Sequence, residues 1–146
     1  MAPTATASAI SPTQAEHFRN ALELALAEAD ADERLGPVLS AAQLRLRFEF
    51  TDTGLGLNVA AGEEGHNLTW SFGVATWPAR LVLSMPVAVA NRFLQGAESI
   101  AIGLARGQVS FQGESRVALR YLPATRLLAG CYRRVVERDF PDLLVK

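Results

Sequence analysis

The sequence is poor in the residues that most often bind metals or form covalent intermediates: its 146 residues include one cysteine and two histidines. The lone Cys131 excludes an intramolecular disulfide and a cysteine-rich zinc site. Because Cys131 falls in a helical pattern of apolar residues, we interpret it as a small buried hydrophobe. His17 and His66 lie in different parts of the chain, and neither has a second histidine at metal-binding spacing. We therefore expect both histidines to be solvated, and we predict no metal site.

An excess of charge of one sign and long apolar runs are also missing. The formal net charge of −1 argues against a protein that neutralises many phosphates, so we expect no nucleic-acid partner. No run approaches the roughly 20 apolar residues that span a bilayer. The first ten residues lack the basic start and apolar core of a secretory signal. We expect a cytoplasmic protein with a disordered tail at residues 1–10 and a single domain at residues 11–146.

The glycine-containing segments and the strand serines do not match the sequence motifs of nucleotide binding or serine catalysis. Residues 54–56 and 103–107 lack the lysine and hydroxyl of a P-loop and the third glycine of a dinucleotide fingerprint. Ser84 and Ser110 have no nucleophile elbow around them. The acidic pair at 63–64 suits a solvated turn better than an acid/base pair. We predict no cofactor and no catalytic residue.

The amino-terminal half predicts a helix followed by three strands. Residues 11–14 form a capping-box helix start, and apolar residues at helical spacing extend that helix to about Ala29. A short helical turn is expected over 37–42. Apolar and polar residues then alternate in three segments separated by glycine turns, which predicts an antiparallel meander. The three predicted strands are 44–51, 55–59 and 67–72.

The carboxy-terminal half predicts two more strands among helices. A fourth strand is expected over 77–85 and a helix over 87–95. The block 99–105 has an apolar alternation that fits either a helix or a strand. A final strand is expected over 108–112. The last third is helical, with Pro123 marking a kink or a break.

The order of these elements, together with the phrase GQVSFQG at residues 107–113, resembles a sterol carrier protein type 2 (SCP2) domain. The resemblance extends over about residues 44–128. It implies an α/β (α+β) SCP2-like fold, in which a five-stranded, mostly antiparallel sheet is covered by helices around an apolar cavity. Many members carry lysine after the first glycine and asparagine or aspartate after the last. This chain has Gln108 and Glu114 at those two positions, and we expect both to face solvent. A partner contact that family members make through the lysine is therefore in doubt for this chain.

Large apolar side chains on one face of the sheet, and on the helices that cover it, are the candidate ligand-binding residues. Composition alone favours a close-packed core, whereas the resemblance implies that sheet and helices separate enough to hold an elongated lipid. The predicted ligand-binding residues are Phe48, Phe50, Trp70, Phe72, Leu81, Leu83, Phe93, Leu94, Ile100, Leu104, Val109, Phe111, Tyr121 and Leu128. The basic cluster Arg133, Arg134 and Arg138 fits a solvated helix face, or else a contact with an anionic membrane or a carboxylate head group.

Three functions follow from the resemblance. The first is binding and transfer of a hydrophobic small molecule such as a sterol, fatty acyl chain, isoprenoid or quinone-like lipid, with transient contact with a membrane surface. The second is a non-catalytic accessory subunit that presents a hydrophobic biosynthetic intermediate to partner enzymes. The third is an enzyme that acts on an apolar substrate through a polar cavity residue such as Arg120 or Tyr121.

Overall fold

The computed structural model describes residues 10–145, and its first element is the helix α1 (Pro12–Ala31). The predicted helix start is confirmed. The backbone N–H of Gln14 donates to Ser11 Oγ at 3.1 Å, and the N–H of Ser11 donates to Gln14 Oε1 at 3.1 Å. The helix ends at Ala31 rather than near Ala29. Residues 1–9 of the predicted disordered tail lie outside the described residues.

Three strands form the predicted antiparallel meander: β1 (Arg45–Phe50), β2 (Leu55–Ala61) and β3 (Leu68–Phe72). The alternation in β1 is confirmed, because its leucine and phenylalanine positions are buried while Arg45 and Glu49 are exposed. A strand with this pattern can bury only one face, so the sheet has one apolar and one polar side at β1.

Two further strands, β4 (Leu81–Met85) and β5 (Ser110–Gly113), complete a five-stranded sheet. β4 runs parallel to β1, and β5 runs antiparallel to β4, which gives the order β3-β2-β1-β4-β5. The sheet is mostly antiparallel, as predicted, with one parallel pair. Both strands begin later than predicted, at residue 81 rather than 77 and at residue 110 rather than 108.

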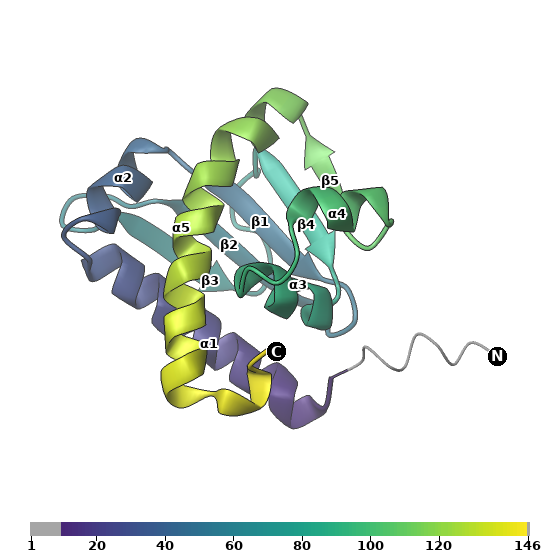
Figure 1. Ribbon diagram of the computed structural model, residues 1–146. Coiled ribbons are helices and arrows are strands. Elements are labelled where there is room, and N and C mark those ends of the chain that lie inside the picture. Colours follow the sequence, from purple (N-terminus) through teal and green to yellow (C-terminus); the bar gives the residue numbers. More distant parts are fainter. Residues whose placement is uncertain (1–9, 146) are drawn as a thin grey trace.

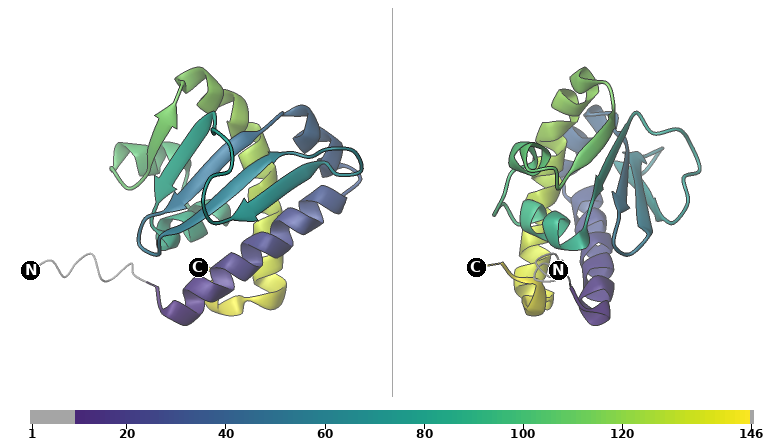
Figure 2. Two further views of the ribbon diagram at one scale, coloured as in Figure 1. Left: turned by 180° about the vertical axis from the view of Figure 1, so that it is seen from behind. Right: turned by 90° about the vertical axis from the view of Figure 1, so that its right-hand side faces the viewer.

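Residues 73–80 cross the outer face of the sheet instead of starting β4 (Figure 2). Arg47 donates a hydrogen bond to the carbonyl of Gly73 at 2.9 Å, and Asn58 Nδ2 donates to the carbonyl of Val74 at 3.0 Å. These side chains from β1 and β2 hold the crossing segment against the sheet. The strand predicted from residue 77 is therefore wrong for residues 77–80.

The helices after α1 lie mainly on the apolar face of the sheet (Figure 1). They are α2 (Leu35–Ala41), α3 (Val87–Leu94), α4 (Ile100–Ala105), α5 (Ser115–Asp139) and the 3-10 helix η2 (Pro141–Leu143). The alternative between helix and strand at residues 99–105 is decided in favour of a helix, which Ser99 caps by accepting the N–H of Ile102 at 3.2 Å. Of the kink or break expected at Pro123, the break is wrong, because α5 continues through this residue. The buried stripe of α5 continues on both sides of Pro123, with Tyr121 before and Ala124 after it, and this packing stabilises the helix.

The core is closely packed where α1 and α5 meet β1. The ring of Phe18 on α1 lies edge-on to Phe50 of β1, with centroids 5.0 Å apart, and its centroid is 5.8 Å from that of Tyr132 on α5. The void in this region measures only about 20 Å³. Such packing is the density expected of a protein interior.

Candidate functional site

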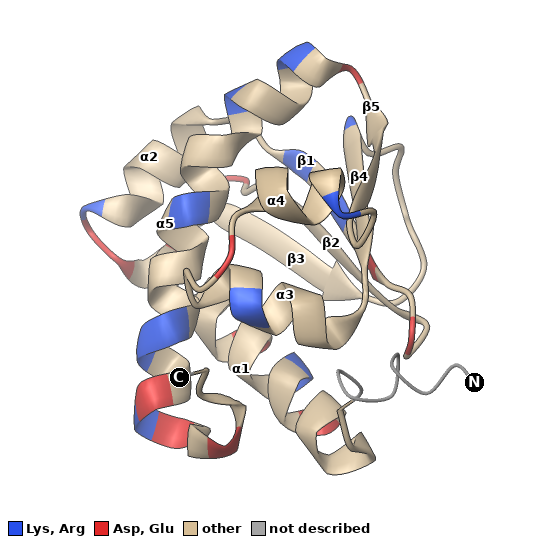
Figure 3. Ribbon diagram, turned by 45° about the vertical axis from the view of Figure 1, so that its right-hand side comes forward, with Lys and Arg blue, Asp and Glu red and all other residues tan. Residues whose placement is uncertain are grey.

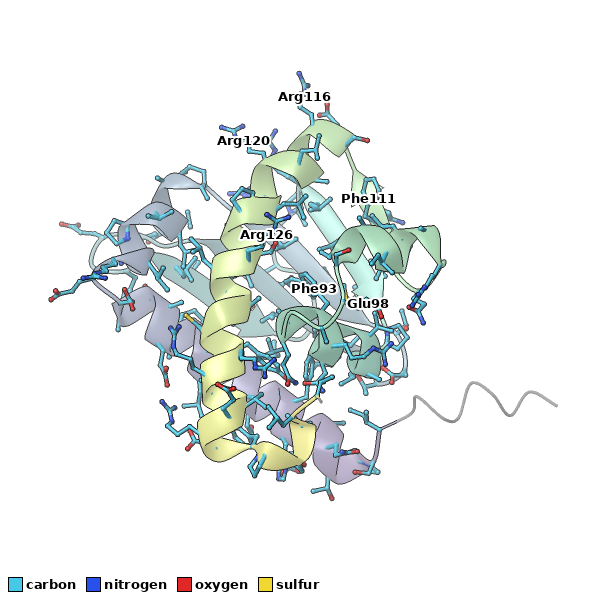
Figure 4. All side chains as sticks on the ribbon, viewed as in Figure 1. Phe93, Glu98, Phe111, Arg116, Arg120 and Arg126 are labelled. Atoms are coloured by element: carbon cyan, nitrogen blue, oxygen red, sulfur yellow. The ribbon has the colours of Figure 1, made fainter. Side chains whose placement is uncertain are left out.

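A second space is far larger: a cavity of about 780 Å³ lies between β4, β5, α3, α4 and α5. Leu83 of β4 and Phe111 of β5 line its sheet side, and Phe93 of α3 lines another wall; Figure 4 labels Phe93 and Phe111 on opposite parts of this region. The cavity opens to the surface, because Leu119 of α5 lines it and is 69% exposed. Its volume lies within the roughly 300–1,000 Å³ typical of small-molecule sites.

Small residues on the surrounding helices leave this space unfilled. Ala118, Ala129 and Gly130 of α5 line the cavity, as does Ala101 of α4. Each of them presents only a methyl group or a hydrogen atom to the cavity. The cavity therefore results from residue size on the helices as much as from the position of the strands.

Eight of the predicted ligand-binding residues come together around the cavity. These residues are Leu81, Leu83, Phe93, Leu94, Ile100, Leu104, Phe111 and Tyr121. They come from the sheet, α3, α4 and α5, so the fold assembles the lining of the cavity from segments distant in the sequence. Their role in binding a ligand stays a prediction.

The other six predicted residues lie elsewhere. Phe48, Phe50 and Leu128 line the small void beneath α1 and α5. Trp70 and Phe72 are half-buried on the edge strand β3. Val109 is buried and packs on α4. A Cβ at Gly103 would lie 2.6 Å from Val109 Cγ2, so Gly103 permits the close approach of α4 to the start of β5. Gly107 instead adopts a positive φ of 73° in the turn that follows α4.

Three charged side chains that the apolar pattern did not identify also line the cavity: Glu98, Arg126 and Arg133. Glu98 Oε2 lies 3.8 Å from Arg92 and 3.6 Å from Arg106. Its Oε1 is buried and has no hydrogen-bond partner within residues 10–145. A buried acceptor without a partner is costly, so this oxygen is a place where a ligand donor would be stabilised. In the sequence, only the position of Glu98 between α3 and α4 could have indicated that this side chain lines the cavity.

Arg133 has a structural role at the cavity wall. It donates to the carbonyl of Gln95 at 2.9 Å and lies 3.3 Å from Glu137. Arg126 is exposed at the opening, and no carboxylate of residues 10–145 forms an ion pair with it. Arg126 is therefore the charged group on the cavity wall that is best placed to meet an outside molecule.

A buried polar network connects α3, α5 and the carboxy-terminal segment beside the cavity. Tyr132 donates to Asn91 Oδ1 at 2.7 Å, and Gln95 Nε2 donates to the same oxygen at 2.7 Å. Asn91 Nδ2 and Gln95 Nε2 both donate to the carbonyl of Leu143 at 2.8 Å. Burial raises the pKa of Tyr132 above its usual range, so this hydroxyl stays a donor.

The remaining titratable groups have structural surroundings. Cys131 is buried, and burial raises the pKa of its thiol, which opposes formation of the nucleophilic thiolate. The histidines are accessible to solvent, but each also meets a carboxylate: His17 lies 2.8 Å from Asp142 and His66 lies 3.0 Å from Asp30. Within residues 10–145, no three histidine, cysteine, aspartate or glutamate side chains group as metal ligands.

The expected exposure of two loop residues is partly wrong. Glu114 is exposed, as predicted, whereas Gln108 is half-buried, and its Oε1 is buried without a hydrogen-bond partner among residues 10–145. The turn between α4 and β5 brings Gln108 against the protein because β5 begins only at Ser110. A simple strand alternation starting at residue 108 could not predict this.

No protein-family model and no curated protein sequence matches the chain. Solved structures do match it. The sterol carrier protein domain 2 of Helicoverpa armigera aligns over 84% of this chain and 94% of its own, with a TM-score of 0.59 and 14% identity. A structure described as a UbiJ-SCP2 ubiquinone synthesis protein aligns over 80% of this chain and 99% of its own, with a TM-score of 0.56 and 15% identity.

A third match is much longer than this chain. It is the inverting sec-alkylsulfatase of a Pseudomonas species, with a TM-score of 0.55 and 13% identity; the match covers 68% of this chain but only 15% of the sulfatase. At such low identities the agreement concerns the fold. The chain has an SCP2-like α+β fold, in which a mixed five-stranded sheet is covered by helices. None of the helices in residues 10–145 has the length and hydrophobicity needed to span a bilayer.

Proposed function

We propose that this chain binds a hydrophobic small molecule in the 780 Å³ cavity and transfers it. The observation that carries the proposal is the contrast between two regions under the same sheet. One is filled down to a void of about 20 Å³, while the other stays open beside exposed residues of α5. Removing an apolar ligand from water into such a space contributes roughly 25 cal/mol for each Å² buried. A sterol, fatty acyl chain, isoprenoid or quinone-like lipid has the required chemistry.

The polar atoms on the wall would orient the ligand. The unpartnered Oε1 of Glu98 can accept a hydrogen bond from a hydroxyl group. Tyr121 already donates to the carbonyl of Gln43, at 3.4 Å, and lies on the sheet side of α5. We therefore assign the head-group end to the region of Glu98, and the apolar body of the ligand to the space between Leu83, Phe111 and α5.

An accessory role is the second candidate. Its support is the fold match to a protein described as acting in ubiquinone synthesis. In that case the cavity would hold a biosynthetic intermediate for partner enzymes, and the chain would perform no chemistry itself. Stable co-purification with enzymes would favour this role, whereas unaided transfer between vesicles by the isolated chain would favour the carrier. A cytoplasmic location suits either role.

Native mass spectrometry of protein purified without detergent tests the binding proposal, together with organic extraction of the same sample. The expected result is a non-covalent adduct at one ligand per chain that disappears on denaturation and is recovered as a lipid in the extract. Empty protein in repeated preparations, combined with no binding of fluorescent fatty acyl or sterol probes, would contradict the proposal.

A further inference from the structure

The amino-terminal half of α5 carries exposed arginines around an exposed leucine. At 100° per residue, Arg116, Leu119, Arg120 and Arg126 project within an arc of about 120°. We call these four residues the arginine stripe. Leu119 is 69% exposed, and the side chain of Arg116 is 85% exposed. Figure 4 shows the three arginines spread along this half of the helix, with Arg126 on the side towards α4.

The charge of the stripe is almost uncompensated. No aspartate or glutamate occurs from Ser115 to Arg126. Within residues 10–145, the only ion pair made by a stripe arginine joins Arg116 to Glu114 at 2.9 Å. Both side chains of that pair are largely exposed, so their mutual attraction is weak. In Figure 3 the upper part of α5 carries blue segments with a single red segment at its start.

The predicted basic cluster at the other end of α5 is different. Arg138 lies 2.7 Å from Glu28 and 2.9 Å from Asp139. Arg133 is engaged by Glu137 and by a backbone carbonyl. These contacts neutralise Arg133 and Arg138, and Arg134 donates to Cys131 Sγ at 3.4 Å. The positive surface of the amino-terminal half of this helix is therefore the arginine stripe.

We propose that the arginine stripe docks on the surface of an anionic lipid bilayer. Arginines attract lipid phosphates and carboxylates, and an exposed leucine between them can enter the apolar boundary of the bilayer. Leu119 and Arg126 belong both to the stripe and to the cavity wall. Docking therefore places the opening of the cavity against the membrane, where an apolar ligand can pass without crossing water. The purpose of the docking, passage of a ligand between membrane and cavity, rests on the proposed function.

A nucleic acid or an acidic protein would also attract arginines. Neither requires a solvent-exposed leucine at the centre of the positive surface. The bilayer explains both the charge of Arg120 and Arg126 and the 69% exposure of Leu119. A comparison between vesicles and a soluble polyanion therefore separates these partners.

The test is co-sedimentation of the full chain with vesicles of phosphatidylcholine alone or mixed three to one with phosphatidylserine. The wild type is expected to prefer the anionic vesicles. R120Q combined with R126Q should weaken that binding roughly 30-fold, and L119S should weaken it several-fold. The matched controls are R34Q combined with R80Q, which alters two exposed arginines outside the stripe, and V38S, since Val38 is 53% exposed on α2. These controls should bind as the wild type does.

Two results would overturn the inference. The first is unchanged vesicle binding in the stripe variants. The second is that the wild type binds soluble heparin as strongly as anionic vesicles, and that L119S changes neither the heparin binding nor the vesicle binding. Thermal melting confirms that each variant is folded. Fluorescent acyl-probe binding without vesicles is measured in parallel. For the wild type, binding to anionic vesicles without binding of the acyl probe would contradict the proposed function alone, whereas probe binding without any preference for anionic vesicles would contradict the docking alone.

Discussion

The hydroxyl of Tyr132 donates a hydrogen bond to Asn91 Oδ1 over 2.7 Å, joining α5 to α3 at a fully buried point. α3 also supplies Phe93 to the cavity wall, and α5 supplies the opposite wall. The bond therefore fixes the separation of two helices between which the cavity lies. Because Asn91 and its neighbour Gln95 are buried, water cannot easily replace a lost partner.

Replacing Tyr132 by phenylalanine should lower the free energy of unfolding by about 1–2 kcal/mol, because the buried acceptor on Asn91 loses one of its two donors at 2.7 Å. Tyr121 provides a matched control, since it is equally buried but its hydroxyl lies 3.4 Å from the carbonyl of Gln43. Tyr121→Phe should cost less than about 0.5 kcal/mol because that bond is long. Chemical denaturation of both variants measures this difference. Equal losses of unfolding free energy in the two variants would contradict the stabilising role of the hydrogen bond from Tyr132 to Asn91.

The carboxylate of Asp30 should make stability depend on pH. It accepts the backbone N–H of Asn67 at 2.6 Å and of Leu68 at 2.9 Å, and it meets His66. Partial burial opposes ionisation, but these hydrogen bonds outweigh it and hold the pKa of Asp30 below its usual value. A depressed folded-state pKa contributes stability above the unfolded pKa of about 3.9, and that stability is lost as the pH falls through the lower folded value.

Asp30→Asn should therefore be less stable than the wild type by about 1–3 kcal/mol near neutral pH, and this difference should narrow as the pH falls below the unfolded-state pKa of about 3.9. Urea unfolding at several pH values measures this gap. Glu64→Gln, in an exposed turn, should leave the stability curve unchanged. If the difference in free energy of unfolding between the wild type and Asp30→Asn stayed constant from neutral to acidic pH, the ionised carboxylate would not be the source of the stabilisation.

Filling the cavity should remove ligand binding without unfolding the protein. Ala118 is half-buried and lines the cavity, so Ala118→Trp directs a large side chain into it. We expect at least a tenfold loss of acyl-probe affinity, with a melting temperature equal to or above that of the wild type. Ala31→Trp, at the exposed end of α1, should bind as the wild type does. Full probe affinity in folded Ala118→Trp would place the ligand elsewhere.

Glu98 should distinguish ligands by their ability to donate a hydrogen bond. A long-chain alcohol can donate to the unpartnered Oε1, whereas its methyl ether cannot. We expect the wild type to prefer the alcohol by roughly tenfold, since hydrogen bonds to charged groups contribute about 1.5–3 kcal/mol. Glu98→Met should abolish this preference, and Glu114→Met, outside the cavity, should keep it. Equal affinities for both lipids in the wild type would remove Glu98 from the head-group site.

Much of the fold could be predicted because local patterns determine it. The capping box at Ser11 and Gln14 marked the first helix, and the alternation through Phe48 marked the first strand. The parallel pairing of β1 with β4 could not be predicted, because a period of two residues identifies the buried face of a strand but not its partner. The start of β4 was wrong because Arg47 and Asn58, from other strands, hold the segment before it.

The candidate site could be predicted only in part, since packed and open interiors use the same residue types. Phe48 and Phe93 are both buried phenylalanines, but Phe48 lines only the small void, whereas Phe93 also lines the large cavity. The difference arises from Ala118, Ala129 and Gly130, whose small size matters only once α5 lies across β4 and β5. The partnerless oxygen of Glu98 likewise depends on three-dimensional surroundings.

The central claim is that an apolar ligand occupies the large cavity, and NMR with a spin-labelled fatty acid tests it most directly. The account predicts that one equivalent of the ligand selectively broadens the methyl signals of Leu83, Leu104 and Leu122, which line the cavity. The signals of Val59 and Leu26, beside the small void, should broaden much less. Recovery of all signals after chemical reduction of the label is the control. Broadening centred on Val59 and Leu26, or none at saturating ligand, would contradict the account.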